Sequence, residues 1–281
     1  MPVYLRPTRT EEALAALAER PLTVLAGGTD FYPARVGRAL DDDVLDITRL
    51  ADLRGIHDCG DHWRIGAAAT WRELIERDLP PCFDGLKQAA REVGGAQIQN
   101  AATVCGNLCN ASPAADGIPP LLTLDARVEL ASSSGTRLLP LADFVRGNRR
   151  TARRADELAT AVSIPKPGAE RAAAHFVKIG ARKYLLISIV MVAVVLEANE
   201  YGALRSARVA VGACSPVAQR LDALEAALRG RSVASDLGAI VRDDHLALLT
   251  PIDDVRADRA YRLDAALTLV RRALEATRAK L

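Results

Sequence analysis

Two glycine-containing segments carry the residue types best suited to chemistry in this chain. The first is Leu25-Ala26-Gly27-Gly28-Thr29-Asp30, and the second is Thr103-Val104-Cys105-Gly106-Asn107. Each combines glycine with threonine and a short polar side chain after an apolar or small-residue stretch. Glycine lets successive backbone N–H groups turn toward one point, and such a nest of amides binds a phosphate oxygen. Two such loops could hold the two phosphates of a dinucleotide.

The common phosphate-binding fingerprints are absent from both segments. A Rossmann site needs Gly-x-Gly-x-x-Gly, whereas the first segment has adjacent glycines followed by Thr29 and Asp30. A P-loop needs Gly-Lys-Ser/Thr, which the chain lacks. For either segment alone, an ordinary tight turn is the competing interpretation.

Size and charge narrow the function further. A chain of 281 residues predicts two or three compact units. Its 37 basic and 35 acidic residues give a net charge of +2, which argues against a nucleic-acid partner. One basic cluster, residues 146–154, is predicted to be a solvated loop, with a partner contact as the alternative.

Neither the cysteines nor the histidines form a catalytic or metal-binding pattern. The five cysteines include no Cys-x-x-Cys pair, which argues against a disulfide framework and a zinc site. Cys105 and Cys109 as metal ligands remain an alternative. The four histidines are scattered, so each is interpreted as a surface or core residue. We therefore predict no catalytic residue and no metal in this chain.

No targeting or membrane segment is evident. The N-terminus lacks the apolar core of a secretory signal, and the longest apolar run, Tyr184 to Leu196, is too short to span a bilayer. That run predicts a buried strand or helix instead. We expect a soluble, cytoplasmic protein without a membrane span.

The pattern of elements predicts an α+β fold, because strands and helices mix without strict βαβ alternation. Thr10, Thr70 and Pro216 are predicted to begin helices, and Gly94 and Gly230 to end them. The predicted strands are 22–25, 44–47, 63–65, 126–131, 175–179, 187–197 and 205–211. The other predicted helices are 85–93, 121–124 and 260–279. Two prolines and a glycine at 163–168 indicate the main domain boundary.

Taken with their flanks, the glycine segments support a more specific interpretation. The N-terminal 165 residues resemble the FAD-binding domain of the molybdenum hydroxylases. This family includes the FAD domain of xanthine dehydrogenase, the medium subunit of carbon monoxide dehydrogenase and the FAD subunit of 4-hydroxybenzoyl-CoA reductase. The resemblance rests on the two segments and on Ala111-Ser112-Pro113-Ala114-Ala115-Asp116, Asp156-Glu157-Leu158, the stretch from Phe176 to Arg182, and Tyr261-Arg262.

The resemblance implies a fold and a domain division. It implies an FAD-binding domain of two α+β subdomains, of the PCMH or vanillyl-alcohol-oxidase type, at residues 1–168 and split near 52–60. A C-terminal α+β domain at residues 169–281 would contain a small antiparallel sheet and a helical bundle.

The resemblance also implies which residues bind FAD. Residues 25–30 would wrap the phosphates from one side, and residues 103–107 would approach the pyrophosphate and ribityl chain from the other. Asp116 would bind flavin or ribityl hydroxyls, and Lys178 would offset phosphate charge. The implied cofactor-binding set is Leu25, Ala26, Gly27, Gly28, Thr29, Asp30, Phe31, Val93, Thr103, Cys105, Gly106, Asn107, Asp116, Leu158, Lys178 and Ile187.

Two positions depart from the family pattern. Cys105 stands where the family usually has a glycine, so the backbone there must accommodate a Cβ. Val93 stands where xanthine dehydrogenases carry a phenylalanine over the flavin, which leaves NAD as the electron acceptor open. The chain also lacks the cysteine-bearing insertion of the reductase branch, so we expect no iron–sulfur cluster in it.

The function implied is that of the FAD subunit in a multi-subunit molybdenum hydroxylase. A large subunit would carry molybdopterin and a small subunit two 2Fe-2S clusters, with NAD, quinone or oxygen as the external redox partner. A dimer of heterotrimers is the assembly the family suggests. Two alternatives stay open: a stand-alone flavin-dependent reductase on a related fold, such as the one acting on enolpyruvyl-UDP-N-acetylglucosamine, and a flavin-free scaffold.

Overall fold

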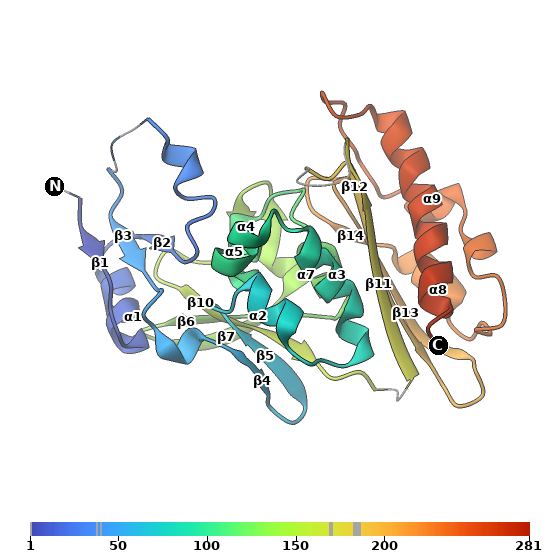
Figure 1. The fold of residues 1–281 in the computed structure, drawn as a ribbon, viewed down its shortest axis with the longest axis horizontal. Helices are drawn as coiled ribbons and strands as arrows, with labels where there is room; N and C mark the ends of the chain where they lie inside the picture. The colour runs from blue at the N-terminus through green and yellow to red at the C-terminus, as the bar shows by residue number, and fades with distance from the viewer. Residues whose placement is uncertain (1, 38, 40, 169–170, 182–186) are drawn as a thin grey trace. The chain divides into compact units, whose positions relative to one another are not determined.

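The computed structural model describes residues 2–37, 39, 41–168, 171–181 and 187–281, and these divide into two compact units (Figure 1). Unit 1 comprises residues 1–77, 95–111 and 126–164, and unit 2 comprises residues 78–94, 112–125 and 165–281. Two segments that lie early in the sequence therefore pack with the C-terminal part of the chain. The domain boundaries given above stay a prediction.

Unit 1 begins with a small parallel sheet of three strands in the order β1-β3-β2. The strands are Tyr4–Leu5 (β1), Thr23–Leu25 (β2) and Val44–Asp46 (β3), and helix α1 spans Thr10–Glu19. The prediction that Thr10 is the N-cap of α1 is wrong. Arg9 occupies that position without a side-chain cap, and the Thr10 hydroxyl donates to Asp52.

The second sheet of unit 1 has five strands in the order β4-β5-β10-β6-β7. These are Ile56–Asp58 (β4), His62–Gly66 (β5), Arg127–Ser132 (β6), Gly135–Pro140 (β7) and Leu158–Pro165 (β10). The pairs β4–β5, β6–β7 and β6–β10 are antiparallel. Helix α7 (Leu141–Phe144) then leads into a two-stranded hairpin of β8 (Val145–Gly147) and β9 (Arg150–Thr151). The 3-10 helices are Pro33–Arg35 (η1) and Ala51–Leu53 (η2).

The second glycine segment begins helix α5 (Val104–Asn110), and it follows α4 (Ala96–Ala101) and contacts the start of α2 (Trp71–Glu76). Thr70 caps α2 as predicted, with a reciprocal bond between its backbone N–H and Glu73. The interpretation of residues 103–107 as a loop is wrong, because Thr103 caps α5 and the following residues form its first turn. The hydroxyl of Thr103 accepts a bond from the Gly106 N–H, which starts the helix there.

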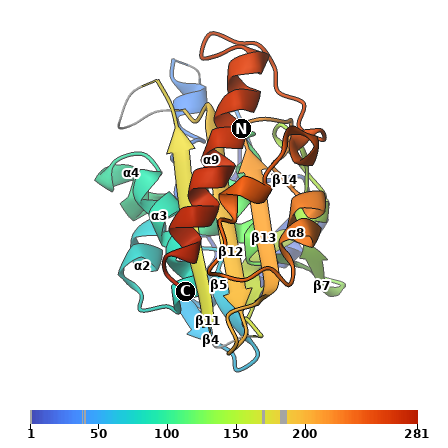
Figure 2. The same cartoon turned by 90° about the vertical axis from the view of Figure 1, so that its right-hand side faces the viewer.

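Unit 2 is built on an antiparallel sheet in the order β11-β12-β13-β14. Its strands are Arg171–Ile179 (β11), Val190–Ala198 (β12), Leu204–Gly212 (β13) and Gln219–Arg220 (β14). Helices α3 (Asp84–Glu92) and α6 (Ile118–Thr123) contact the sheet, as do α8 (Asp222–Leu228) and α9 (Arg259–Arg278). Figure 2 shows α9 lying along the sheet. The short 3-10 helices of this unit are Pro81–Phe83 (η3), Gly238–Ile240 (η4) and Asp243–Leu246 (η5).

Strand β12 is buried along its whole length because both faces of the sheet are covered. Val192 and Val194 face the apolar core formed with α8 and α9, whereas Met191 and Ala193 pack with Ala89 of α3. This arrangement explains the continuous apolar run that the sequence shows. Tyr184, where that run begins, and Arg182 lie outside the described residues.

The α+β class and the small antiparallel sheet of the C-terminal part are confirmed. The prediction that α8 begins at Pro216 is wrong, since it begins at Asp222. Residues 219–220 form β14 at the edge of the sheet instead. No helix among the described residues is long and apolar enough to cross a membrane.

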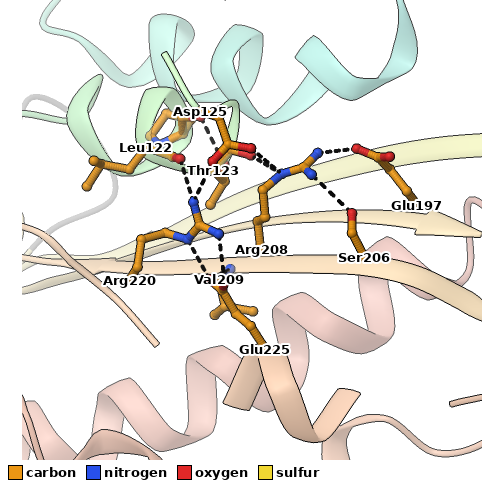
Figure 3. A network of polar contacts seen from close by, with 10 residues as sticks. Leu122, Thr123, Asp125, Glu197, Ser206, Arg208, Val209, Arg220 and Glu225 are labelled. Atoms are coloured by element: carbon orange, nitrogen blue, oxygen red, sulfur yellow. Dashed lines mark hydrogen bonds and ion pairs between the residues drawn. The ribbon is translucent and has the colours of Figure 1, made fainter. Parts of the chain in front are cut away.

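A network of charged side chains ties the segment 112–125 to the sheet of unit 2 (Figure 3). Arg208 donates to the Thr123 carbonyl at 2.6 Å and pairs with Glu197. Arg220 donates to the Leu122 carbonyl at 3.0 Å and pairs with Glu225 at 2.5 Å. The two arginines thus bind carbonyl groups at the end of α6, where the Leu122 carbonyl also accepts from the Asp125 N–H at 3.1 Å.

We predict that Arg208→Ala lowers the free energy of unfolding of unit 2 by about 3 to 5 kcal/mol, because it leaves the Glu197 carboxylate buried without its cation. Denaturant unfolding measures the effect. Arg205→Ala, which removes an exposed arginine from the same strand, is the control and should change stability little. Equal stability of the two variants would contradict a structural role for the network.

Candidate cofactor site

The first glycine segment follows β2 and lies directly against the residues that lead into α5. A Cβ added to Gly27 would lie 1.9 Å from the Ala101 carbonyl oxygen, which is a backbone atom that cannot swing aside. Gly28 has a φ of +71°, a conformation that favours glycine. The structure therefore brings the two glycine segments together within unit 1, and it requires glycine at both positions.

The backbone N–H groups of the first segment are unused. Within the described part of the chain, those of residues 26–31 donate to no protein acceptor. Carbonyl groups of the same segment are used, because Leu25 accepts from Ile47 and Gly28 accepts from Tyr32. The segment is thus anchored through its carbonyls while its donors stay available, as an anion-binding loop requires.

The second segment differs from the predicted nest of amides. The N–H of Val104 donates to the Ala69 carbonyl at 3.1 Å, and that of Asn107 donates to the Thr103 carbonyl at 3.1 Å. Gly106 leaves room for the threonine cap, because a Cβ there would lie 2.7 Å from the Thr103 hydroxyl oxygen. Most amides of this turn therefore bond within the protein, and Thr103 itself is 6% exposed.

One side-chain atom of α5 is left without a partner. Among the described residues, the Oδ1 atom of Asn107 is buried and accepts no hydrogen bond. A buried unpaired acceptor is costly, so it indicates a donor that the protein itself does not supply. A ligand hydroxyl or N–H group, or an ordered water, would satisfy it.

Sequence reasoning missed the contact that joins the two segments. Arg149 donates to both carboxylate oxygens of Asp30, at 2.7 and 3.3 Å, and to the Asn110 amide oxygen at 2.7 Å. Arg149 lies in an exposed turn, as the interpretation of residues 146–154 as a solvated loop expects, but its guanidinium is paired. Asp30 and Arg149 are 119 residues apart, and a sequence alone gives no sign that two residues at that distance form an ion pair.

Glu157 of the Asp-Glu-Leu motif stabilises the fold of unit 1. Its carboxylate accepts from Arg137 at 2.6 and 2.9 Å and from the Arg154 N–H at 2.7 Å. The Arg137 guanidinium lowers the pKa of Glu157. The neighbouring Leu158 opens β10 and is 1% exposed, so its side chain lies in the core of unit 1.

Unit 2 brings together a second group of the predicted residues. Lys178 pairs with the Asp116 carboxylate at 2.8 Å and donates to the Glu92 carbonyl at 3.2 Å. The Ser188 hydroxyl donates to the other oxygen of Asp116 at 2.7 Å. Asp116 and Lys178 thus hold each other, and the expectation that Lys178 acts on phosphate charge stays a prediction.

The remaining predicted residues of unit 2 are sequence neighbours of two residues that contact this ion pair, Glu92 and Ser188. Val93 follows Glu92 at the end of α3, and Ile187, which is 65% exposed, precedes Ser188. Ser188 is missing from the predicted set, although it stands beside Ile187. No residue signature could have singled it out, because serine beside an apolar run is common.

Burial and pairing act in opposite directions on Asp116. Burial raises the pKa of Asp116, while Lys178 and the Ser188 hydroxyl oppose that rise. Desolvation disfavours the charged carboxylate, and the cation compensates for part of that cost. The ion pair therefore keeps a charged group in the interior of unit 2.

The cysteines do not form a metal site in the part of the chain that the structure describes. No group of three or more His, Cys, Asp or Glu side chains there could hold an ion. Cys105, on the same helix as Cys109, is 2% exposed, and its neighbour Cys109 raises its pKa. The side chain of Cys105, which replaces the usual glycine, is therefore accommodated in the core of unit 1.

Comparison with known families identifies the class of protein to which this fold belongs. A family model described as the FAD binding domain in molybdopterin dehydrogenase matches residues 1–167, and one described as the CO dehydrogenase flavoprotein C-terminal domain matches residues 175–277. The chain therefore belongs to the family of FAD-binding subunits of molybdenum-dependent dehydrogenases. Members of this family are oxidoreductase subunits, and their cofactor is FAD.

Named relatives and solved structures agree with this assignment. The nicotinate dehydrogenase FAD-subunit of Eubacterium barkeri is 36% identical over 207 residues, covering 71% of this chain and 70% of that one. The xanthine dehydrogenase FAD-binding subunit of Escherichia coli O157:H7 is 31% identical, covering 96% and 94%. A chain of reconstituted CO dehydrogenase from Oligotropha carboxidovorans superimposes with a TM-score of 0.92 at 26% identity, covering 100% and 99%.

We predict that Lys178→Met destabilises unit 2 by about 3 to 5 kcal/mol at neutral pH, because the Asp116 carboxylate stays buried without its cation. The pKa of Asp116 should rise further, so the deficit should shrink as pH falls and the carboxyl group takes up a proton. The difference in unfolding free energy between variant and wild type, followed from pH 7 into the acidic range, measures this effect. The double variant Asp116→Asn/Lys178→Met is the control. It has no carboxyl group at position 116, so the pH-dependent loss of stability seen in Lys178→Met should be absent from it.

Proposed function

We propose that this chain binds FAD and works as the electron-transfer subunit of a multi-subunit molybdenum hydroxylase. The observation that carries the proposal is the run of unused N–H groups at residues 26–31, held against the start of α5 by the Gly27–Ala101 contact. The residues present fit the cofactor, because these donors suit a diphosphate and the unpaired Asn107 oxygen suits a hydroxyl.

When bound, FAD would supply the exchange of electrons between iron–sulfur clusters of a partner subunit and an external redox partner. The chain's own residues bind and orient the cofactor. The amides of residues 26–31 would hold phosphate oxygens, and the side chain of Asn107 would accept a hydrogen bond from the ligand. That Val93, Asp116, Leu158, Lys178 and Ile187 contact the same cofactor remains part of the proposal.

Membership of the family supports a proposal for the partners. We propose a large molybdopterin-binding subunit and a small 2Fe-2S subunit, with NAD, quinone or oxygen as the external redox partner, in the cytoplasm. Several relatives are named medium chains or medium subunits, among them the carbon monoxide dehydrogenase medium chain of Hydrogenophaga pseudoflava, which is 26% identical over 281 residues. These names support an assembly in which this chain is intermediate in size between a larger and a smaller subunit.

Flavin binding is tested by titrating the chain with FAD. Gly28→Ala should raise the Kd for FAD at least about tenfold, or 1.4 kcal/mol, because a Cβ at φ +71° is strained and would lie 2.6 Å from the Tyr32 ring. Gly60→Ala is the matched control, since Gly60 has a φ of +91° and nothing within 4 Å of its added Cβ. Equal Kd values for both variants would refute the loop assignment.

Assembly is tested by purifying a tagged form of this chain after expression with the two predicted partner subunits. Molybdenum and iron should be retained with it in a fixed ratio, and metal analysis of the purified complex measures them. A chain that purifies alone and oxidises NAD(P)H against a soluble substrate would instead favour the stand-alone reductase. A chain that takes up no flavin would favour the scaffold.

A further inference from the structure

Arg149 stands in an unusual backbone conformation. Its φ of 54° lies in the left-handed region, which a side chain other than Asn, Asp or Gly seldom adopts. It occupies the turn between β8 and β9, and its N–H donates to the Ala111 carbonyl at 2.9 Å. The turn is therefore hydrogen-bonded to the end of α5, and an arginine stands at a position where asparagine or glycine would be less strained.

Stability alone does not account for this arginine. The side chains of Arg149 and Asp30 are 58% and 49% exposed, and exposed ion pairs contribute little to folding. The strain at Arg149 acts against stability as well. A residue that is strained and weakly stabilising indicates a contribution to function.

The position of Asp30 suggests what that contribution is. Asp30 belongs to the run of unused N–H groups, so its carboxylate places a negative charge on the loop that would receive a phosphate. Like charges repel, and the repulsion weakens anion binding. The Arg149 guanidinium cancels this charge through two bonds to the carboxylate, and its bond to Asn110 fixes the loop to α5.

We infer that Arg149 is a positioning residue for the diphosphate of the cofactor, which neutralises Asp30 and holds the glycine loop against the end of α5. This inference rests on the proposed function, because it concerns how the same loop accepts FAD. It adds a residue outside both glycine segments, and it explains why an aspartate is tolerated in a loop built for an anion.

The test variant is Arg149→Asn, because asparagine suits a φ of 54° and should not impair folding of the hairpin. Its Kd for FAD should rise about tenfold, with a melting temperature equal to or above that of the wild type. Arg150→Ala is the matched control, since it removes an exposed arginine from the same hairpin. It should leave the Kd within about twofold.

A second variant separates charge neutralisation from simple packing. Asp30→Asn/Arg149→Asn removes the carboxylate together with its partner, so it should recover most of the lost affinity. A double variant as weak as Arg149→Asn would overturn the inference, as would a wild-type Kd in Arg149→Asn or an equal loss in Arg150→Ala. Failure of the wild type to bind FAD would instead refute the proposed function itself.

Discussion

The close approach of Gly27 to the Ala101 carbonyl is the constraint on which the candidate site depends. No side chain can stand between these backbones, since even a Cβ would lie 1.9 Å from the carbonyl oxygen. This contact places the end of β2 beside the residues that begin α5, although about seventy residues separate them in the sequence. A half-buried loop with unused amides thereby gains a fixed position next to a helix that supplies Asn107 and Asn110.

The two units each contain an ion pair among the candidate site residues, and the two pairs differ in burial. In unit 1 an exposed arginine pairs with Asp30, where solvent screens the interaction and leaves it adjustable. In unit 2 the Lys178–Asp116 pair is nearly covered, with side chains 5% and 10% exposed, and its loss would leave a buried charge. The first pair is suited to tuning affinity for an anion, and the second to keeping the segment around Asp116 in place.

Local signals in the sequence predicted much of this structure. The Thr70 cap, the buried run that became β12 and the final amphipathic helix all depend on residues within one or two turns of each other. The loop interpretation of residues 103–107 failed because glycine there serves the Thr103 cap, which only the folded backbone shows. Arg149 was missed for another reason: its partners Asp30 and Asn110 are distant in the chain, and pairing at that distance leaves no local pattern.

Long-range polar contacts also explain why the early segment 112–125 packs with the sheet of unit 2. This segment belongs to unit 2 together with residues 78–94. Segment 112–125 carries Asp116 and ends at α6, whose last carbonyl groups are bound by Arg208 and Arg220 from the sheet. Each of these arginines binds a helix carbonyl and a carboxylate. Removing either partner would leave a largely buried charge without a hydrogen bond, which costs free energy. The segment and the sheet therefore stabilise each other. Asp116 is therefore positioned from two directions within unit 2: by Lys178 and Ser188 at its carboxylate, and by the arginines at the far end of the helix that follows it.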